Sequence, residues 1–379
     1  MHNTSLIAAL ENLQARQLTS IFGLPFDVVS ERQAIDHLIS CIESNKRCFL
    51  STPNLNFAIA SQNNRSFRQS VLESDLSVAD GMPLIWISKL AGPCLPERVA
   101  GSSVFQELYK TPANSKIKVF YFGGNPGVAE LAHQETNRVS PGMESVGFYD
   151  PGFGSIDDMS SADIIEKINT AKPDFLLIAL GAVKGQAWIQ HNQHRLDASV
   201  ISHLGAVINF VAGSVSRAPK FWQRIGAEWL WRIIEEPSLW KRYFSDGKMF
   251  TQLFFTRVIP LYLRQLRENN QTEDSTATLL IRADSLDQPI SVLFNGTFSA
   301  RDCDTLLAQL KEILQAEQDS KQMSLDITSA TDIKAPAIAK LAILQALLNN
   351  HGIEFSLTGA QQNIVKLLKL HMVEGLISR

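Results

Sequence analysis

The sequence predicts an α/β protein: a doubly wound, mainly parallel sheet with a helical C-terminal appendage, followed by a smaller α/β region. Three observations support this prediction. Between about residues 20 and 212, short apolar runs alternate with stretches of helical periodicity. The apolar runs are nearly continuous, which is typical of strands covered by helices on both faces. After a polar stretch at 268–278 the alternation begins again, as expected for a second domain.

Six apolar runs are the expected strands of the large sheet, and helical patterns lie between them. The strands are RCFLST (47–52), LSVA (76–79), IKVFYFGG (117–124), MESVGFY (143–149), DFLLIALG (174–181) and AVINFVAG (206–213). The clearest helical patterns are FRQSVLES (67–74), GVAELAHQETNRV (127–139) and ADIIEKINTA (162–171).

The last hundred residues repeat the alternation on a smaller scale. Strands are expected at 289–296, 323–328 and 353–359, and helices at 302–318 and 335–352. The polar stretch before them lacks aromatic residues and is typical of a linker. We therefore predict a first domain at 1–268 that includes a basic helical appendage at 217–268, a linker at 269–278, and a second domain at 279–379.

Composition excludes several classes of protein. The chain is 45% hydrophobic and 19% charged, with a formal net charge of −3, so its overall charge gives no reason to expect nucleic-acid binding. The four cysteines show no paired metal-ligand spacing and are expected to be reduced and buried in a cytoplasmic protein. The N-terminus lacks the pattern of a secretory signal, and no uncharged apolar run reaches the length of a membrane-spanning helix.

Positive charge is concentrated in one segment. Residues 217–267 carry ten Lys/Arg, four Asp/Glu and four of the six tryptophans. Such a segment fits a surface that meets anionic lipid headgroups or a diphosphate, but it equally fits a helical hairpin packed on the core. Charged residues recur every four positions and would form one helical stripe, in which pairing with the glutamate is the structural alternative: Lys220, Arg224, Glu228 and Arg232.

Polar residues follow the first two expected strands. Asp80 stands at the end of LSVA and directly before Gly81, while Thr52, Asn54 and Asn56 follow RCFLST. In doubly wound sheets the carboxyl ends of strands carry the binding site, where a hydroxyl and carboxamides can bind a sugar or a nucleobase. The structural alternatives are a strand-ending turn for Asp80 and a proline-containing turn with asparagine caps for the others.

Three further loops precede helices and are candidates for phosphate contacts. A glycine-rich turn after the third strand offers backbone N–H groups and a helix N-terminus, although its spacing matches neither the P-loop nor the dinucleotide fingerprint. A doubly wound sheet gathers such loops along one edge. The candidate substrate-binding residues in these loops are Gly123, Gly124 and Asn125, then Lys184 and Gln186, then Arg98 and Gly101.

Taken in order, these stretches resemble the WecG/TagA/CpsF glycosyltransferases (glycosyltransferase family 26). The resemblance covers about residues 20 to 245, with the motifs FGLPFDVVS, TPN, ADGMP, ERVAG, FGGNPGVAE, KPDFLLIALGAVKGQAWI and RAPKFWQRIGAEWLWRIIEEPSLWKRY. It implies inverting transfer of a sugar, commonly N-acetylmannosamine, from a UDP-sugar to a polyprenyl-diphosphate-linked saccharide of a bacterial surface polysaccharide or exopolysaccharide. It also implies that neither a metal ion nor another cofactor takes part.

The resemblance assigns roles to the candidate residues. Asp80 would be the base that takes the proton of the acceptor hydroxyl, with Thr52 and Asn54 in the same pocket. The glycine turn would provide N–H dipoles for the leaving diphosphate. Positive charge would come from Arg217, Arg224 and Arg232 of the appendage, which in the family also seats the enzyme on the inner face of the cell membrane.

One loop departs from the family pattern. Where the family usually has G-x-P-K-Q-E-x-W, this chain has GAVKGQAW. Lys184 and Trp188 persist, whereas Val183, Gly185 and Gln186 replace Pro, Gln and Glu. This loop is expected to contact the donor or the acceptor, so the departure leaves the donor sugar unassigned. An alternative therefore stays open, in which the chain is a degenerate transferase fold that binds lipid or nucleotide and acts as a scaffold.

The second domain more faintly resembles a STAS domain, the fold of anti-sigma-factor antagonists. In such domains a serine in a turn after the LDIT-like strand is often phosphorylated. The matching turn here, IKAPA (333–337), has no hydroxyl. A serine switch at this turn is therefore not expected, whereas a protein-docking role that needs no phosphorylation stays open. Self-association in the family makes a homo-oligomer a further expectation.

Overall fold

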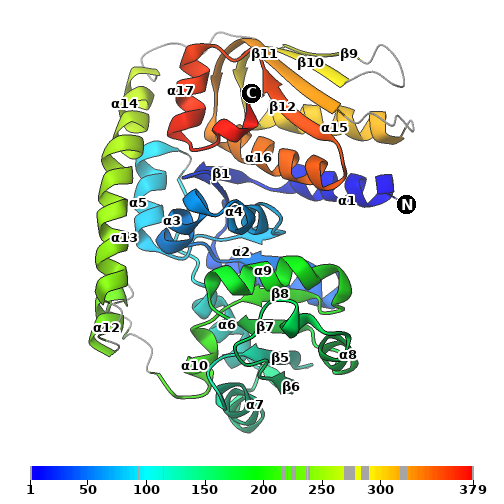
Figure 1. The fold of residues 1–379 in the computed structure, drawn as a ribbon, viewed down its shortest axis with the longest axis vertical. Helices are drawn as coiled ribbons and strands as arrows, with labels where there is room; N and C mark the ends of the chain where they lie inside the picture. The colour runs from blue at the N-terminus through cyan, green and yellow to red at the C-terminus, as the bar shows by residue number, and fades with distance from the viewer. Residues whose placement is uncertain are drawn as a thin grey trace. The chain divides into compact units, whose positions relative to one another are not determined.

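The structure is a computed structural model, shown in Figure 1. It describes residues 2–92, 94–113, 115–215, 219, 221–222, 228–235, 237, 240–268, 278–282, 290–315 and 322–377. The chain divides into two compact units. We call Val29–Ile85 with Pro96–Phe250 the central unit, and Met1–Val28, Trp86–Leu95 and Thr251–Arg379 the terminal unit.

The central unit is built on a six-stranded sheet in which every strand pair is parallel. The strand order is β4-β3-β8-β7-β5-β6. This arrangement confirms the predicted doubly wound parallel sheet. The strands are β3 (Cys48–Ser51), β4 (Leu76–Ser77), β5 (Ile117–Gly123), β6 (Met143–Tyr149), β7 (Phe175–Ala179) and β8 (Val200–His203).

Both faces of this sheet are buried, which explains the continuous apolar runs. Along β5, Val119 and Tyr121 join one hydrophobic core, whereas Phe120 and Phe122 join the other. Successive side chains of a strand point to opposite faces, so each strand contributes to both cores. The first core includes α2 (Glu31–Glu43), α6 (Gly101–Lys110), α7 (Val128–Val139) and α10 (Val207–Val211), and the second includes α8 (Ala162–Thr170) and α9 (Ala182–Asn192).

One predicted strand is wrong. The run AVINFVAG (206–213) contains the short helix α10 (Val207–Val211). The strand that lies between β3 and β7 is β8 (Val200–His203), which precedes this run in the sequence. β8 was not predicted because it contains the polar residues Ser202 and His203. Both are buried, and the Ser202 hydroxyl is satisfied because it donates to the carbonyl oxygen of Leu50 at 2.9 Å. As a helix, the run packs Val207 and Ile208, together with Val211 and Ala212 one turn later, against the first core.

The remaining elements of the central unit connect the strands. Helices α3 (Leu55–Asn63) and α4 (Arg65–Leu72) lead from β3 to β4, and α12 (Glu228–Glu235) precedes α13 (Trp240–Leu253). Two 3-10 turns flank the second core, at Asp158–Ser160 and Gln193–Arg195. Helix α5 (Met82–Ala91) follows the turn that contains Asp80, and from Trp86 onward its residues belong to the terminal unit.

The terminal unit contains a second sheet of four strands, in the order β12-β11-β10-β9. The pairs β10–β11 and β11–β12 are parallel, and β9–β10 is antiparallel. The predicted strands and helices of the last hundred residues are present, and β9 is an addition that begins at the end of the predicted linker. The elements are β9 (Thr278–Arg282), β10 (Ile290–Phe298), α15 (Ala300–Gln315), β11 (Gln322–Ile333), α16 (Ala335–Asn350), β12 (Glu354–Thr358), α17 (Gln362–Leu370) and a 3-10 turn at Glu374–Leu376.

The beginning of the chain belongs to this same unit. Helix α1 (His2–Ala15) packs on α15 and α16, and the antiparallel hairpin of β1 (Leu18–Ile21) and β2 (Leu24–Asp27) packs on α16. The terminal unit also holds a π-helical turn at Phe254–Val258 and α14 (Ile259–Glu268). Residues 269–277 of the predicted linker (269–278) lie outside the described residues, and the predicted domain boundaries remain a prediction.

Two expectations about composition have an outcome. Cys41, Cys48 and Cys303 are buried as expected, but Cys94 is exposed, so the expectation fails for that residue. Cys94 lies between α5 and α6 and belongs to neither core of the central unit. In the part of the chain that the structure describes, no helix combines the length and the apolar character needed to cross a bilayer.

A buried lysine joins three helices of the terminal unit. The Lys340 side chain is 3% exposed, forms an ion pair with Asp304, and donates to the carbonyl oxygen of Gln14 at 3.1 Å. Removing the carboxylate leaves a buried ammonium group without its counter-charge. We expect Asp304→Ala to lower the free energy of unfolding by about 2 kcal/mol, measured as a lower melting temperature by calorimetry.

The double variant Lys340→Met/Asp304→Ala separates this effect from general damage to α15. It removes both charges and is expected to recover most of the lost stability, while Glu312→Ala on the same helix leaves the melting temperature unchanged. Equal destabilisation by the single and double variants would show that the ion pair contributes nothing.

Candidate active site

The backbone places Asp80 beside the loop that follows β3. Beyond the β3–β4 pair, the N–H of Val78 donates to the carbonyl oxygen of Ser51 at 3.0 Å, and the N–H of Asp80 donates to that of Pro53 at 2.9 Å. Parallel pairing thus continues for three residues past β4. Asp80 is partly exposed rather than sealed in the core, so its carboxylate lies at the carboxyl edge of the sheet, as predicted.

Thr52 and Gly101 come together at the same edge. The N–H of Val99 donates to the carbonyl oxygen of Ala79 at 3.0 Å, which brings the start of α6 beside the Asp80 turn. A Cβ atom on Gly101 would lie 2.8 Å from Thr52 Cγ2 and 2.5 Å from Leu204 Cδ2. Only glycine permits this approach, because such distances are shorter than van der Waals contact. Three separate segments therefore meet at Thr52, Asp80 and Gly101.

The two asparagines after β3 have structural contacts. The side-chain oxygen of Asn54 accepts from the N–H of Phe57 at 3.2 Å and caps α3. Asn56 donates to Asp246 of α13 at 3.3 Å. The capping alternative thus describes Asn54 correctly. Its Cβ would still be 3.9 Å from a Cβ on Gly81, so Asn54 also borders the Asp80 turn.

Arg98 carries positive charge to this edge and is held by an ion pair. Its Nη1 lies 2.7 Å from Glu228 Oε2 and its Nη2 lies 3.4 Å from Glu228 Oε1. Burial lowers the pKa of Arg98, but the hydrogen bond and charge of Glu228, with the charges of Asp80 and Glu31, outweigh this and raise it. Glu228 thus pairs with Arg98 from a distant segment. Arg98 lies within the electrostatic field of Asp80.

The glycine turn after β5 has the backbone geometry that only glycine adopts easily. Gly123 and Gly124 have φ angles of 89° and 101°. The N–H of Gly124 donates to the carbonyl oxygen of Ala179 at 2.8 Å, so this N–H is engaged within the sheet. Asn125 beyond it is exposed. Asn125 is thus the one residue of these three that carries a side chain, and this side chain is exposed to solvent.

The stretch GAVKGQAW is not a loop: Gly181 caps α9, and the other seven residues form the beginning of that helix. Lys184 donates to the carbonyl oxygen of Gly154, and the Gln186 amide is fully buried against the hydroxyl of Ser51 at 3.0 Å. Trp188 donates to the carbonyl oxygen of Met159 at 2.8 Å and stacks on Phe122. In this structure Lys184 and Gln186 therefore position the beginning of α9 against the rest of the central unit.

Packing explains why this chain has glycine at position 185, where the family pattern has another residue. A Cβ atom at this position would lie 2.3 Å from Cδ2 of His203, so the imidazole at the end of β8 occupies the space that a side chain would need. Burial lowers the pKa of His203 to about 4. Its Nε2 is buried without a hydrogen-bond partner among the described residues. His203 was not predicted as a functional residue because β8, the strand that ends with it, was not predicted.

The three predicted arginines of the appendage are not placed. Arg217 and Arg224 lie outside the described residues, and Arg232 belongs to α12 but its side chain is not described. Their predicted role therefore stays a prediction.

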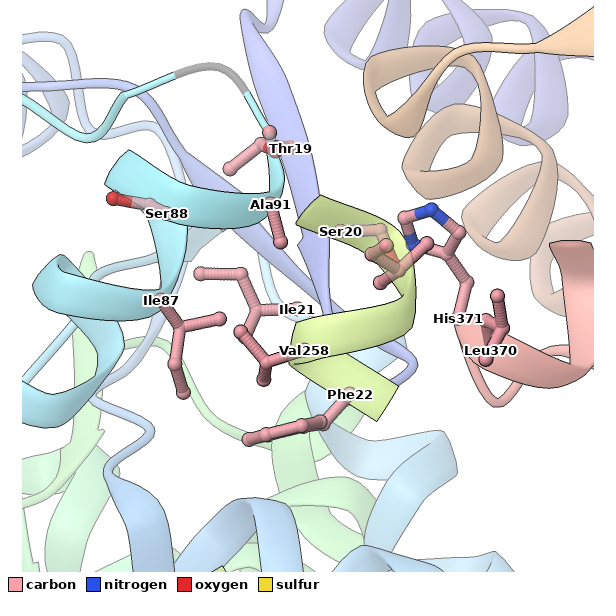
Figure 2. Close-up of a pocket in the computed structure, with 12 residues that line it drawn as sticks. Thr19, Ser20, Ile21, Phe22, Ile87, Ser88, Ala91, Val258, Leu370 and His371 are labelled. Carbon is pink, nitrogen blue, oxygen red and sulfur yellow. The ribbon is translucent and has the colours of Figure 1, made fainter. Parts of the chain in front are cut away.

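Two cavities lie elsewhere among the described residues. One belongs to the terminal unit, has a volume of about 10 Å³, and is lined by Ile21, Ile87 and Val258, with His371 at one side (Figure 2). It has room for about one water molecule. The other is an open recess of about 520 Å³ in the central unit. It is lined by Ser66, Ile156, Asp157, Ala187, Gln190 and His191, and Asp80 lines neither.

Comparison with known proteins decides the family. Residues 19–263 match the Glycosyl transferase WecG/TagA/CpsF family. The chain belongs to this family. The match covers the whole six-stranded sheet and every predicted site residue, and it ends before β9.

Several relatives share a name and cover much of this region. The chain is 28% identical over 218 residues to the N-acetylglucosaminyldiphosphoundecaprenol N-acetyl-β-D-mannosaminyltransferase of Bacillus spizizenii, covering 57% of this chain and 83% of that protein. It is 27% identical over 233 residues to the enzyme of that name from Bacillus subtilis strain 168, covering 61% and 89%. The Staphylococcus aureus strain MW2 enzyme is 23% identical over 224 residues, covering 59% and 85%.

The buried His203 makes stability depend on pH. Its pKa is about 4 in the folded chain and 6.5 in the unfolded chain. Below pH 6.5 the unfolded chain binds a proton that the folded chain excludes, so stability falls as the pH decreases from about 6.5 to about 4. The full difference corresponds to about 3 kcal/mol. We expect His203→Leu to remove this part of the pH dependence, measured by calorimetry across that range.

His371 provides the matched comparison, because burial lowers its pKa to about 4 in the terminal unit. His371→Leu is expected to flatten the pH dependence of the terminal unit and to leave that of the central unit unchanged. A central unit that loses stability equally steeply in wild type and His203→Leu would contradict the assignment.

Proposed function

We propose that the protein is an inverting, metal-independent glycosyltransferase that moves a sugar from a UDP-sugar to a polyprenyl-diphosphate-linked saccharide. The observation that carries the proposal is the meeting of Asp80, Thr52 and Gly101 at the carboxyl edge of the sheet, with Arg98 beside them. Membership of the family supports a glycosyltransferase, and the names of the relatives support a diphosphoundecaprenol-linked acceptor. An N-acetylmannosamine-type donor follows from the same names.

In the proposed reaction the acceptor hydroxyl oxygen attacks the anomeric carbon of the donor. The bond from that carbon to the diphosphate oxygen breaks with its electron pair, and UDP leaves. Asp80 accepts the proton of the hydroxyl as the new bond forms. Asp80 is partly exposed at the carboxyl edge of the sheet, which is where a bound substrate would lie.

Thr52 and Arg98 support this step in different ways. Thr52 is 7% exposed and packed against the start of α6, so its hydroxyl is held at a fixed place beside the base. Arg98 is oriented by Glu228, which limits the entropy lost when a guanidinium group binds an anion. A fixed cation of this kind stabilises the negative charge that develops on the leaving diphosphate.

The second candidate is a scaffold that has kept the fold and lost transfer. The internal contacts of Lys184 and Gln186 favour it, because both side chains are engaged in the fold. It differs from the enzyme in one respect that an assay detects directly, since a scaffold binds UDP or lipid without producing UDP from a UDP-sugar.

We also propose that the protein works at the inner face of the cell membrane. In the central unit, α12 and α13 carry large exposed apolar side chains within a basic segment. Trp229, Trp240 and Phe244 are 48%, 52% and 72% exposed, respectively. Aromatic residues suit the headgroup region, and basic residues suit anionic lipids. A peripheral position would bring the site to a lipid-linked acceptor.

The C-terminal part of the chain is proposed to be a STAS-like module that docks another protein. Its supporting observations are the parallel β10–β11–β12 order and the helix α16, which starts at Ala335 with a proline in its first turn. The absence of a hydroxyl at residues 333–337 favours docking that needs no phosphorylation. Formation of a homo-oligomer is part of the same proposal.

The base role of Asp80 is tested by Asp80→Asn. We expect transfer from a UDP-sugar to a polyprenyl-diphosphate-linked acceptor to fall by roughly 10²–10⁴-fold, because the amide cannot accept the proton. Binding of UDP, measured by calorimetry, should remain nearly unchanged. Asp163→Asn, at an exposed position of α8, is the matched control and should keep full activity. Wild-type rates in Asp80→Asn would remove Asp80 from the base role.

The charge of the appendage is tested by replacing Arg217, Arg224 and Arg232 with glutamine. Each basic residue near an anionic surface contributes about 1 kcal/mol, so binding to anionic liposomes or to the acceptor should weaken by roughly a hundredfold. The control replaces three exposed lysines elsewhere in the central unit, Lys110, Lys118 and Lys172. Unchanged partitioning together with unchanged acceptor affinity would mean that the arginines serve only the fold.

A further inference from the structure

Three ligand-type side chains meet at the opposite edge of the central unit's sheet from Asp80. They are His37 and Cys41 of α2, and Cys48 at the start of β3. Their imidazole nitrogen and sulfur atoms all lie within 4.8 Å of one another. The histidine is exposed, whereas the Cys41 and Cys48 side chains are 4% and 0% exposed. The mechanism proposed above uses none of the three.

Local structure explains why they meet. His37 and Cys41 are four residues apart on α2, so they share one face of the helix. Cys48 returns to that face through a short turn, in which the N–H of Lys46 donates to the carbonyl oxygen of Cys41 at 2.8 Å. The N–H of Cys48 then donates to Ser199 at 2.7 Å as the strand begins. Both ends of the turn are therefore fixed by backbone bonds.

The spacing fits a tetrahedral zinc centre. Bond lengths of about 2.3 Å to sulfur and about 2.0 Å to nitrogen put tetrahedral ligand atoms about 3.5–3.8 Å apart. Cys41 Sγ lies 3.6 Å from His37 Nε2, which already matches one edge of such a tetrahedron. The 4.8 Å limit on the other two distances leaves a closure of at most about 1.3 Å. Rotation of the exposed imidazole can shorten the distance from His37 to Cys48 Sγ, and rotation of the cysteine side chains about χ1 can shorten the distance between the two sulfur atoms.

The ligand types also indicate which ion the site would take. A sulfur-rich, partly buried set of two cysteines and one histidine selects thiophilic ions such as Zn²⁺ over Mg²⁺ or Ca²⁺.

We propose that His37, Cys41 and Cys48 form a Zn²⁺ site, with water on the exposed histidine side as the fourth ligand. The site joins the C-terminal part of α2 to the first residue of β3. Its role is structural, because Thr52 and Asp80 lie at the other ends of β3 and β4. It is therefore independent of a metal-free transfer reaction.

The test uses the full-length protein, reduced and stripped of metal. Titration with Co²⁺ should give a thiolate-to-cobalt charge-transfer band and the visible bands of a four-coordinate ion, saturating at one ion per chain. Added Zn²⁺ should displace the cobalt. Zn²⁺ should also raise the melting temperature of the central unit, since an ion that binds only the folded chain stabilises it.

Three variants identify the ligands. Cys41→Ser and Cys48→Ser should abolish the charge-transfer band, and His37→Gln should weaken Zn²⁺ binding by at least about a hundredfold, because losing a ligand costs more than losing its outer-shell support. His37→Gln keeps both buried thiols and so preserves the fold. Cys94→Ser and His191→Gln are the matched controls, one exposed cysteine and one exposed histidine, and both should bind like wild type.

Two results would overturn the proposal. The first is a wild-type protein that binds Co²⁺ and Zn²⁺ no better than His37→Gln. The second is a Cys41–Cys48 disulfide that forms readily and, after reduction, leaves a protein with no metal-dependent absorption. Asp80→Asn is expected to bind Zn²⁺ like wild type, so failure of the metal site and failure of the proposed transfer are distinguishable.

Discussion

The candidate site depends on the parallel alignment of β3 and β4 beyond their last paired residues. Two backbone hydrogen bonds, from Val78 to Ser51 and from Asp80 to Pro53, continue the alignment into the loops. These bonds place the Asp80 residue at the carboxyl edge of the sheet, where it is partly exposed. If this alignment ended at β4, Asp80 would be an ordinary turn residue far from Thr52.

Other contacts extend this alignment into a site. The bond from Val99 to Ala79 brings α6 to the same edge, and Gly101 lets it approach Thr52 more closely than any side chain would allow. Arg98 reaches the edge from the same segment and is oriented by Glu228 of α12. The positions of Asp80, the Thr52 hydroxyl and the Arg98 guanidinium thus depend on three loops and one helix that are distant in the sequence. A single buried sheet holds all of these loops.

Much of this arrangement could be predicted because strand-end positions follow from periodicity. The parallel sheet and the edge position of Asp80 were predicted from apolar runs followed by polar turns. β8 was missed because Ser202 and His203 are polar, although both are buried, and AVINFVAG was taken for a strand because a short apolar run does not distinguish a strand from a helix. The buried roles of Gln186 and Gly185 depend on Ser51 and His203, which only the folded chain brings near.

The most direct test of the account is a crystal structure of the protein with UDP bound. The account predicts that the diphosphate lies along the carboxyl edge of the six-stranded sheet, between the Gly123–Gly124 turn and Arg98. The Asp80 carboxylate would face the open side of the β-phosphate, where the anomeric carbon of a donor would stand. UDP bound in the recess lined by Gln190 and His191, or at the edge with Asp80 pointing away from it, would contradict the account.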